Sequence, residues 1–266
     1  MSSTVDNHPE KAFYRDTSTK SQLPTAAPGD SIPRSTVQSL IAELRADPYN
    51  VPLHVRLANA YAADNRFEDA VALMKNAVEL PTADNQTVEY YEDLQIYRAR
   101  FRLSVAQKNS LPGGSGDLTD VAEKLQWDLN RLELDIFRRR SERYPQDLAL
   151  AFGLAARLRL NGKLDEAEPL LTRLLNEPSL RASSHWELGK CKQQQQRLVD
   201  ALKHFRLAAA SCGPDQLDLK KKALHRAGSL AVTMKLTESA REYFQQLVDL
   251  DPSYKDAQAQ LRKLSS

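Results

Sequence analysis

The sequence has little of what several classes of protein require. Its 266 residues include only two cysteines, Cys191 and Cys212, which exclude a disulfide framework and a thiolate metal cluster. Glycine is scarce, at 9 residues, and alternating runs of β-branched residues are absent, so strands are not expected. No apolar stretch approaches the roughly 18 residues that a membrane span needs, and the N-terminus lacks the apolar core of a secretory signal. We therefore expect a cytoplasmic protein, unless processing has removed a leader.

An excess of charge of one sign is also missing. The 37 Lys and Arg nearly balance the 35 Asp and Glu, which gives a formal charge of +2. Nonspecific nucleic-acid binding depends on neutralising phosphates with a basic surface, so any such patch here must be local. The run "IFRRRSERYPQD" at 136–147 is the obvious candidate. However, successive helical residues point about 100° apart, so we interpret these arginines as helix-end charges, and nucleic acid is not an expected partner.

Strong helix formers dominate most of the chain. Leu, Ala, Arg, Gln and Glu fill most windows after residue 35, separated by short breaks rich in Pro, Gly, Asn or Asp. Residues 1–34 differ, because Ser, Thr, Asp and Pro predominate there without apolar periodicity. The sequence therefore predicts an all-α fold that follows a disordered tail at 1–34.

A spacing pattern recurs four times along the helical part. A small residue is followed twelve positions later by an alanine and, four positions after that, by a large apolar residue. A helix pair explains this pattern, since a small residue lets the second helix approach the first closely, and stacked pairs share a core. The three sets are Ala58, Ala155, Gly189 and Gly228; Ala70, Ala167, Ala201 and Ala240; and Met74, Leu171, Phe205 and Phe244.

This arrangement resembles the tetratricopeptide repeat (TPR), a helix–turn–helix unit of about 34 residues. The interval from Ala167 to Ala201 is 34, and a proline closes each unit. The resemblance implies an α-α superhelix, a TPR-like solenoid over 35–264. We expect hairpins at about 51–82, 85–145, 148–178, 182–213 and 221–252 and a capping helix at 253–264. The hairpin at 85–145 is stretched, with two long helical patterns joined by "NSLPGGSG".

The resemblance also implies that the first helices of the hairpins line a concave groove. Counting from each small residue, we predict a partner-binding groove that includes Asn59, Phe152, Arg159, Trp186, Lys190, Lys222, His225 and Arg226. Trp and Arg are common anchors of interfaces. We hypothesise that the C-terminal half of the groove binds an extended or helical peptide, which its basic residues would suit if the peptide is acidic. The alternative, that Trp186 packs against the adjacent hairpin, stays open at this stage.

Signals for other functions are weak. The histidines show no metal-ligand spacing, and "GGSG" follows a helix without the Lys-Ser or Lys-Thr of a phosphate loop. The clamp for a C-terminal carboxylate in chaperone-binding relatives is not expected, because Asn59 matches it but Phe152 and Ala156 do not. We expect no catalytic residues, cofactor, metal or membrane association.

The expected function is a scaffold or adaptor that binds a protein or peptide partner. Two alternatives remain. One is a structural subunit that self-associates through the long central hairpin, as a homo-oligomer. The other is an RNA-binding helical repeat.

Overall fold

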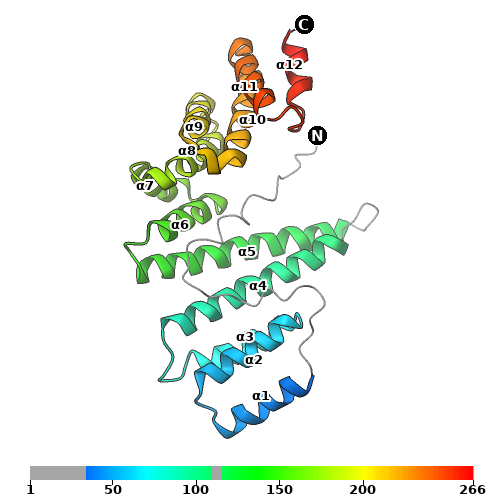
Figure 1. Ribbon diagram of the computed structural model, residues 1–266, viewed down its shortest axis with the longest axis vertical. Coiled ribbons are helices and arrows are strands. Elements are labelled where there is room, and N and C mark those ends of the chain that lie inside the picture. Colours follow the sequence, from blue (N-terminus) through cyan, green and yellow to red (C-terminus); the bar gives the residue numbers. More distant parts are fainter. Residues whose placement is uncertain (1–33, 110–115, 266) are drawn as a thin grey trace. The chain divides into compact units, whose positions relative to one another are not determined.

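The computed structural model describes residues 34–109 and 116–265, which form α-helices joined by short turns (Figure 1). These ranges contain twelve α-helices, one short 3-10 turn and no strand. The predicted all-α fold is confirmed. The predicted tail lies outside the described residues except for Arg34, with which the first helix begins, and so does most of the "NSLPGGSG" connection.

The chain divides into two compact units, the first ending at Ile136 and the second beginning at Phe137. The first unit contains α1 (Arg34–Ala46), α2 (Val51–Ala63), α3 (Phe67–Ala77), α4 (Asn85–Asn109) and most of α5 (Gly116–Arg143). The second unit contains the end of α5, α6 (Leu148–Leu160), α7 (Leu164–Leu174), α8 (Pro178–Gln194), α9 (Leu198–Ser211), α10 (Leu217–Thr233), α11 (Thr237–Leu250) and α12 (Ala257–Ser265).

Some helix boundaries differ from the sequence prediction. Pro178 was expected to close a hairpin, but α8 begins with it, four residues earlier than predicted. A proline fits the first turn of a helix, because the N–H that it lacks would have no partner within the helix there. Helix α10 likewise begins at Leu217 rather than near 221, and α12 begins at Ala257 rather than 253.

The same turn joins the two helices of four hairpins. Each turn contains one residue with a positive φ: Asn65 (59°), Gly162 (73°), Gln196 (60°) and Lys235 (59°). The N–H of the residue that follows donates to a carbonyl five positions back, as from Lys163 to Leu158 at 2.9 Å and from Arg197 to Lys192 at 2.9 Å. This is the Schellman motif, which provides partners for the last carbonyls of a helix. Only one of the four positions is glycine, so the other three accept the cost of a left-handed backbone.

The small residues of the repeat lie against the large apolar residues of the next helix. A Cβ added at Gly189 would lie 2.6 Å from the ring of Phe205, and one added at Gly228 would lie 2.9 Å from the ring of Phe244. Phe205 is fully buried and also belongs to a cluster with Ala227 and Leu230 of the following hairpin. The large residue therefore packs both within its own hairpin and against the next one, which joins the hairpins of the second unit into one core.

Gly189→Ala should lower the free energy of unfolding. The added methyl group collides with Phe205, and overpacking of this kind costs about 1–3 kcal/mol, which outweighs the roughly 1 kcal/mol that alanine contributes through helix propensity. Urea unfolding followed by circular dichroism measures the change. In a Phe205→Leu background the collision is relieved, so the same substitution should be neutral or stabilising; a rise in the urea midpoint of Gly189→Ala alone would contradict the packing argument.

Gly162→Ala provides a matched comparison with a different cause. A Cβ at Gly162 meets nothing within 4 Å, but its φ of +73° is unfavourable for any L side chain. The expected loss is about 1–2 kcal/mol. No truncation of a neighbouring side chain should restore it, unlike the loss at Gly189.

Candidate functional site

The structure places the eight predicted groove residues in different units. Asn59 lies on α2 in the first unit, where its side-chain oxygen accepts a hydrogen bond from the Tyr90 hydroxyl at 2.7 Å. The other seven lie in the second unit, on α6, α8 and α10. Asn59 therefore takes part in packing α2 against α4, and the candidate site is built from the second unit alone.

Three of the predicted residues line a single pocket of about 320 Å³. They come from three successive first helices: Arg159 from α6, Lys190 from α8 and Arg226 from α10. We call this site the cationic pocket; its lining residues are Arg159, Lys190, Gln193, Gln194, Gln196 and Arg226.

A buried carboxylate holds two of these cations in place. Glu187, which is 7% exposed, accepts from Arg159 Nε at 2.6 Å through Oε2 and pairs with Lys190 Nζ at 2.5 Å through Oε1. Burial acts to raise the pKa of Glu187, but the adjacent Lys190 and Arg159 outweigh it and the pKa is lowered. Glu187 is therefore ionised at neutral pH, and it cancels one of the three positive charges around the pocket.

Sequence reasoning missed Glu187, Gln194 and Gln196. Glu187 precedes Lys190 by three positions on α8, a spacing at which helical side chains are neighbours. That spacing could have identified the pair. Nothing in the sequence indicated that Arg159, 28 positions away, shares the same carboxylate.

The third cation, Arg226, is held differently. Its Nε donates to Gln193 Oε1 at 3.1 Å, and its side chain is exposed. Gln193 lies one turn after Lys190 on α8, so this bond joins α10 to the same face of α8. Three cations thus line the pocket, and each is positioned by a neighbour.

Two of the remaining predicted residues, Trp186 and Phe152, contribute to packing. The ring of Trp186 lies 5.3 Å from that of Phe205 and under Lys190 Nζ, which is 5.4 Å from its centroid. Trp186 therefore packs against its own and the following hairpin, which favours the alternative left open by the sequence. Phe152 is buried, with 8% of its surface exposed. Lys222 is half-buried.

His225 also has a structural environment. Its Nε2 lies 2.8 Å from Asp256 Oδ1, and its ring packs edge-on against Phe244 and Tyr254. These contacts connect α10 to the segment that leads into α12, so His225 stabilises the C-terminal end of the second unit.

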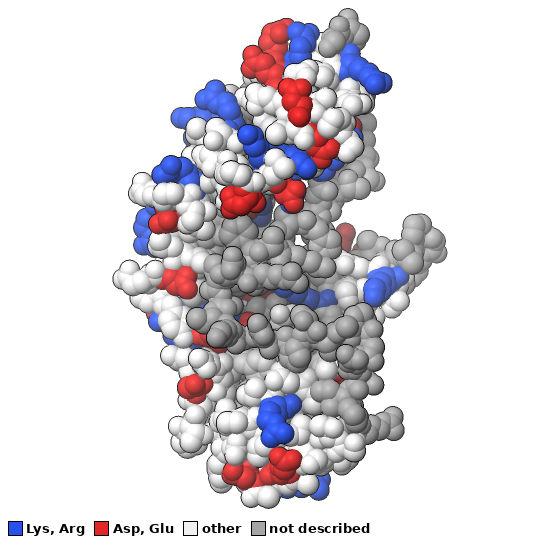
Figure 2. All heavy atoms as spheres, viewed as in Figure 1, with Lys and Arg blue, Asp and Glu red and all other residues white. Residues whose placement is uncertain are grey.

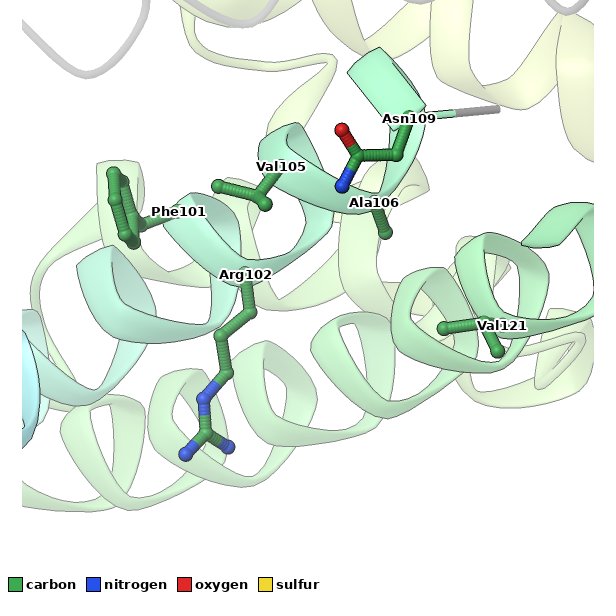
Figure 3. Close-up of a pocket in the computed structure, with 6 residues that line it drawn as sticks. All are labelled: Phe101, Arg102, Val105, Ala106, Asn109 and Val121. Atoms are coloured by element: carbon green, nitrogen blue, oxygen red, sulfur yellow. The ribbon is translucent and has the colours of Figure 1, made fainter. Parts of the chain in front are cut away.

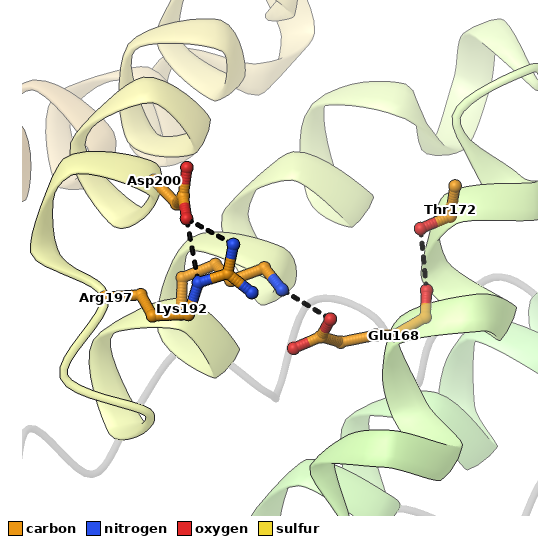
Figure 4. Close-up of polar contacts among 5 residues, drawn as sticks. All are labelled: Glu168, Thr172, Lys192, Arg197 and Asp200. Carbon is orange, nitrogen blue, oxygen red and sulfur yellow. Dashed lines mark hydrogen bonds and ion pairs between the residues drawn. The ribbon is translucent and has the colours of Figure 1, made fainter.

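A second polar cluster lies between α7, α8 and α9. Lys192, which is buried, pairs with Glu168 of α7, while Arg197 pairs with Asp200 at the start of α9 (Figure 4). Nearby, the Nδ1 atoms of His185 and His204 are 3.1 Å apart. Burial, His204 and Arg181 lower the pKa of His185 to about 4, and burial with Lys192 and Lys203 also lowers the pKa of His204. Both rings are therefore neutral at pH 7.

The His185–His204 pair should make the fold sensitive to mild acid. In the unfolded chain a histidine has a pKa of about 6.5, so below that pH the unfolded state binds protons that the folded state excludes, and the free energy of unfolding falls. We expect a lower urea midpoint at pH 5.5 than at pH 7. The drop should be smaller in a His185→Gln, His204→Gln double variant, and an equal drop in both proteins would refute the assignment.

Neither cysteine has the properties of a nucleophile. Burial raises the pKa of Cys191 to about 11 and also raises that of Cys212, so both stay protonated at neutral pH and a reactive thiolate is disfavoured. In residues 34–109 and 116–265, no group of three or more His, Cys, Asp or Glu is placed to hold a metal ion. None of the helices in these ranges is both long and apolar enough to span a bilayer.

Charges of both signs are intermixed on the face of the molecule in Figure 2. The arginine run of α5 follows this pattern, since Arg138 pairs with Glu166 at 2.7 Å. Arg140, in contrast, is buried, with 8% exposed, so only part of the run lies on a solvated helix face. The run therefore does not form one flat basic patch.

Comparisons with known proteins agree with the geometry. Residues 221–254, which include α10 and α11, match the family model described as tetratricopeptide repeat. No curated protein matches the sequence. Among solved structures, YrrB, described as a TPR protein with an unusual peptide-binding site, is 16% identical with a TM-score of 0.50 over 84% of this chain and 97% of that chain.

Two further structures align with lower TM-scores. A tetratricopeptide repeat protein from Parabacteroides merdae ATCC 43184 is 14% identical, with a TM-score of 0.42 over 87% of this chain and 92% of that chain. A structure of Naa15/Naa10 bound to HypK-THB is 16% identical, with a TM-score of 0.44 over 88% of this chain and 37% of that chain. At 16% identity, the likeness to YrrB concerns the fold alone. The predicted resemblance is confirmed: this chain is similar to tetratricopeptide repeat proteins and is built from helical hairpins of that type.

Proposed function

We propose that the chain is a non-catalytic scaffold or adaptor that binds a protein or peptide partner on the first helices of its second unit. The observation that carries the proposal is the cationic pocket, to which α6, α8 and α10 each contribute one cation. A surface made by several hairpins needs correct stacking, so it is a property of the repeat array rather than of one hairpin. The TPR-like fold commonly mediates protein–protein interaction, and YrrB is described as having a peptide-binding site.

The composition of this surface also supports protein binding. Arginine is enriched at the energetic centres of interfaces because its planar group makes several directed hydrogen bonds. Lys222 lies one turn before Arg226 on α10 and extends the positive charge beyond the pocket. Trp186 is a poor residue to probe, because its packing on Phe205 means that its removal would also disturb the core.

Replacing Lys222 and Arg226 with alanine should reduce partner capture without unfolding the protein. The side chain of Arg226 is exposed and that of Lys222 is half-buried, so their loss removes charge rather than core volume. The measurement is affinity purification from lysate followed by quantitative mass spectrometry, with wild type and variant in parallel. Arg206→Ala, an exposed cation on α9, is the matched control. Identical partner sets for wild type and the double variant would overturn the proposal.

The long central hairpin supports a second candidate, self-association with another copy of this chain. Tyr97, Phe101 and Val105 follow one face of α4 and are 39–43% exposed. Phe101 and Val105 line an open pocket of about 340 Å³ with Val121 of α5 across from them (Figure 3). Contiguous exposed apolar surface of this kind is typical of interaction sites.

The charges near this pocket favour a second copy as its occupant. On α4, Lys108 is exposed, and so is Arg102, which also pairs with Glu68; within 120–128, the part of α5 that contains Val121, the exposed charges are Asp120, Glu123, Lys124 and Asp128. A two-fold axis that lays α4 of one copy on α5 of the other would bring opposite charges together beside the apolar row.

If the hairpin self-associates, the mass measured by light scattering should rise above 29.9 kDa as concentration increases. Val105→Glu places a charge in the apolar row, so it should keep the protein monomeric. Val199→Glu is the control, since Val199 on α9 is 70% exposed and lies outside the hairpin. A constant monomer mass for wild type would exclude this candidate and leave the groove proposal unaffected.

A further inference from the structure

We propose that the His185–His204 pair is a two-step proton latch between α8 and α9. In the first step a proton binds His204 and the hydrogen bond between the rings persists; in the second step a proton binds His185 and the bond breaks. The latch goes beyond the proposed function, because it acts within one hairpin whether or not a partner binds.

The two histidines form one of two adjacent aromatic contacts between α8 and α9. The rings of His185 and His204 have their centroids 5.3 Å apart and are tilted by 43°. The next residue of each helix repeats the contact, since the rings of Trp186 and Phe205 are also 5.3 Å apart. The contact of Trp186 with Phe205 does not titrate. The hairpin therefore has one permanent contact and, beside it, one that protons can change.

The geometry of the histidine pair admits only one hydrogen between the facing nitrogens. The Nδ1 atoms of His185 and His204 are 3.1 Å apart, which is a hydrogen-bonding distance. A neutral imidazole carries a hydrogen on one nitrogen and accepts through the other. One ring therefore donates through Nδ1–H and the other accepts through Nδ1, and a hydrogen on both Nδ1 atoms would break the bond.

The surroundings of the two rings assign His204 as the donor. His185 is 9% exposed, whereas His204 is half-buried and more open to solvent. When His204 donates through Nδ1–H, its basic lone pair lies on Nε2, and a proton that binds there leaves Nδ1–H in place. The hydrogen bond to His185 then becomes charge-assisted, which makes it stronger.

The charges around the pair favour the same order of protonation. Burial lowers the pKa of both rings, to about 4 for His185, and nearby cations act in the same direction. These cations are Arg181 beside His185, and Lys192 and Lys203 beside His204. Two carboxylates oppose the lowering of the pKa of His204, namely Glu168 of α7 and Asp200 of α9. His204 therefore takes up the first proton.

Glu168 has an oxygen that a charged His204 would compensate. Its Oε2 pairs with the buried Lys192 (Figure 4), whereas its Oε1 is buried and has no hydrogen-bond partner among the residues that the structure describes. A buried acceptor without a partner costs free energy. A positive charge on His204 offsets part of this cost by attracting the carboxylate, so the state with one added proton is stabilised.

The second proton has the opposite effect. On His185 it adds an N–H that faces the Nδ1–H of His204, and it brings two positive charges together. The two rings must then move apart, while Trp186 and Phe205 stay in contact. The latch therefore remains closed in mild acid and opens in stronger acid, near the pKa of about 4 of His185.

NMR of the full-length chain labelled with ¹⁵N-histidine tests the assignment at neutral pH. Couplings between ring nitrogens and ring hydrogens distinguish the Nδ1–H and Nε2–H forms of a neutral histidine. We expect Nδ1–H on His204 and Nε2–H on His185, and the His204 signals should titrate first as the pH falls. Each ring is identified by the signals that disappear in His185→Gln or in His204→Gln.

The opening of the latch is followed in the same titration through nuclear Overhauser effects. Those between His185 and His204 should persist through the first step and vanish in the second, while those between Trp186 and Phe205 remain. Persistence of the histidine effects with both rings charged would contradict the opening, and loss of both sets together would show unfolding of the hairpin instead of a latch.

Glu168→Gln should lower the pKa of His204, because it removes one of the two carboxylates that favour the charged ring. Asp165→Asn, which changes an exposed acid on the same helix, is the matched control and should leave the pKa of His204 as in wild type. Equal values of this pKa in the two variants would refute the part assigned to Glu168.

Nδ1–H on His185, Nε2–H on both rings, or uptake of the first proton by His185 would overturn the latch. These forms are measured on the wild-type chain, so they decide the inference even if Glu168→Gln does not fold. Partner capture by the Lys222→Ala, Arg226→Ala variant tests the proposed function separately, and neither result determines the other.

Discussion

The close contact between small residues on the first helices and large apolar residues on the second helices determines the geometry of the second unit. At Gly189 there is no space for a methyl group, because the ring of Phe205 occupies it. Phe205 then reaches Ala227 and Leu230 of the following hairpin. One aromatic ring thus sets both the separation of two helices within a hairpin and the packing of one hairpin on the next. Any change in that separation would shift the first helices relative to one another.

The cationic pocket depends on this arrangement, because its residues come from separate hairpins. Arg159 and Glu187 are 28 positions apart in sequence, and Gln193 and Arg226 are 33 apart, yet each pair forms a hydrogen bond. Such contacts form only when α6, α8 and α10 stack side by side. The Schellman turns contribute as well, since they end α6 and α8 at equivalent points and so align the last turns of these helices.

Helix α8 carries two buried charged side chains, Glu187 and Lys192, which serve different purposes. Toward the pocket, Glu187 is fully compensated by two cations, which keeps it ionised and keeps those cations ordered. Toward α7 and α9, Lys192 pairs with Glu168, and two neutral histidines face each other. Buried ion pairs contribute little net stability, but a lost partner is costly. These contacts therefore specify how α8 packs more than they strengthen the fold.

The sequence by itself determined the helical class and the hairpin repeat, because these follow from local composition and from spacing within one or two helices. It predicted a groove of eight residues, three of which, Arg159, Lys190 and Arg226, line one pocket. Only the tertiary structure decided which of the predicted residues meet. It placed Asn59 in the first unit, gave Trp186 and His225 packing contacts, and paired Glu187 with Arg159. The physical reason is that these outcomes depend on distances between helices, and those distances are set by side chains far apart in the sequence.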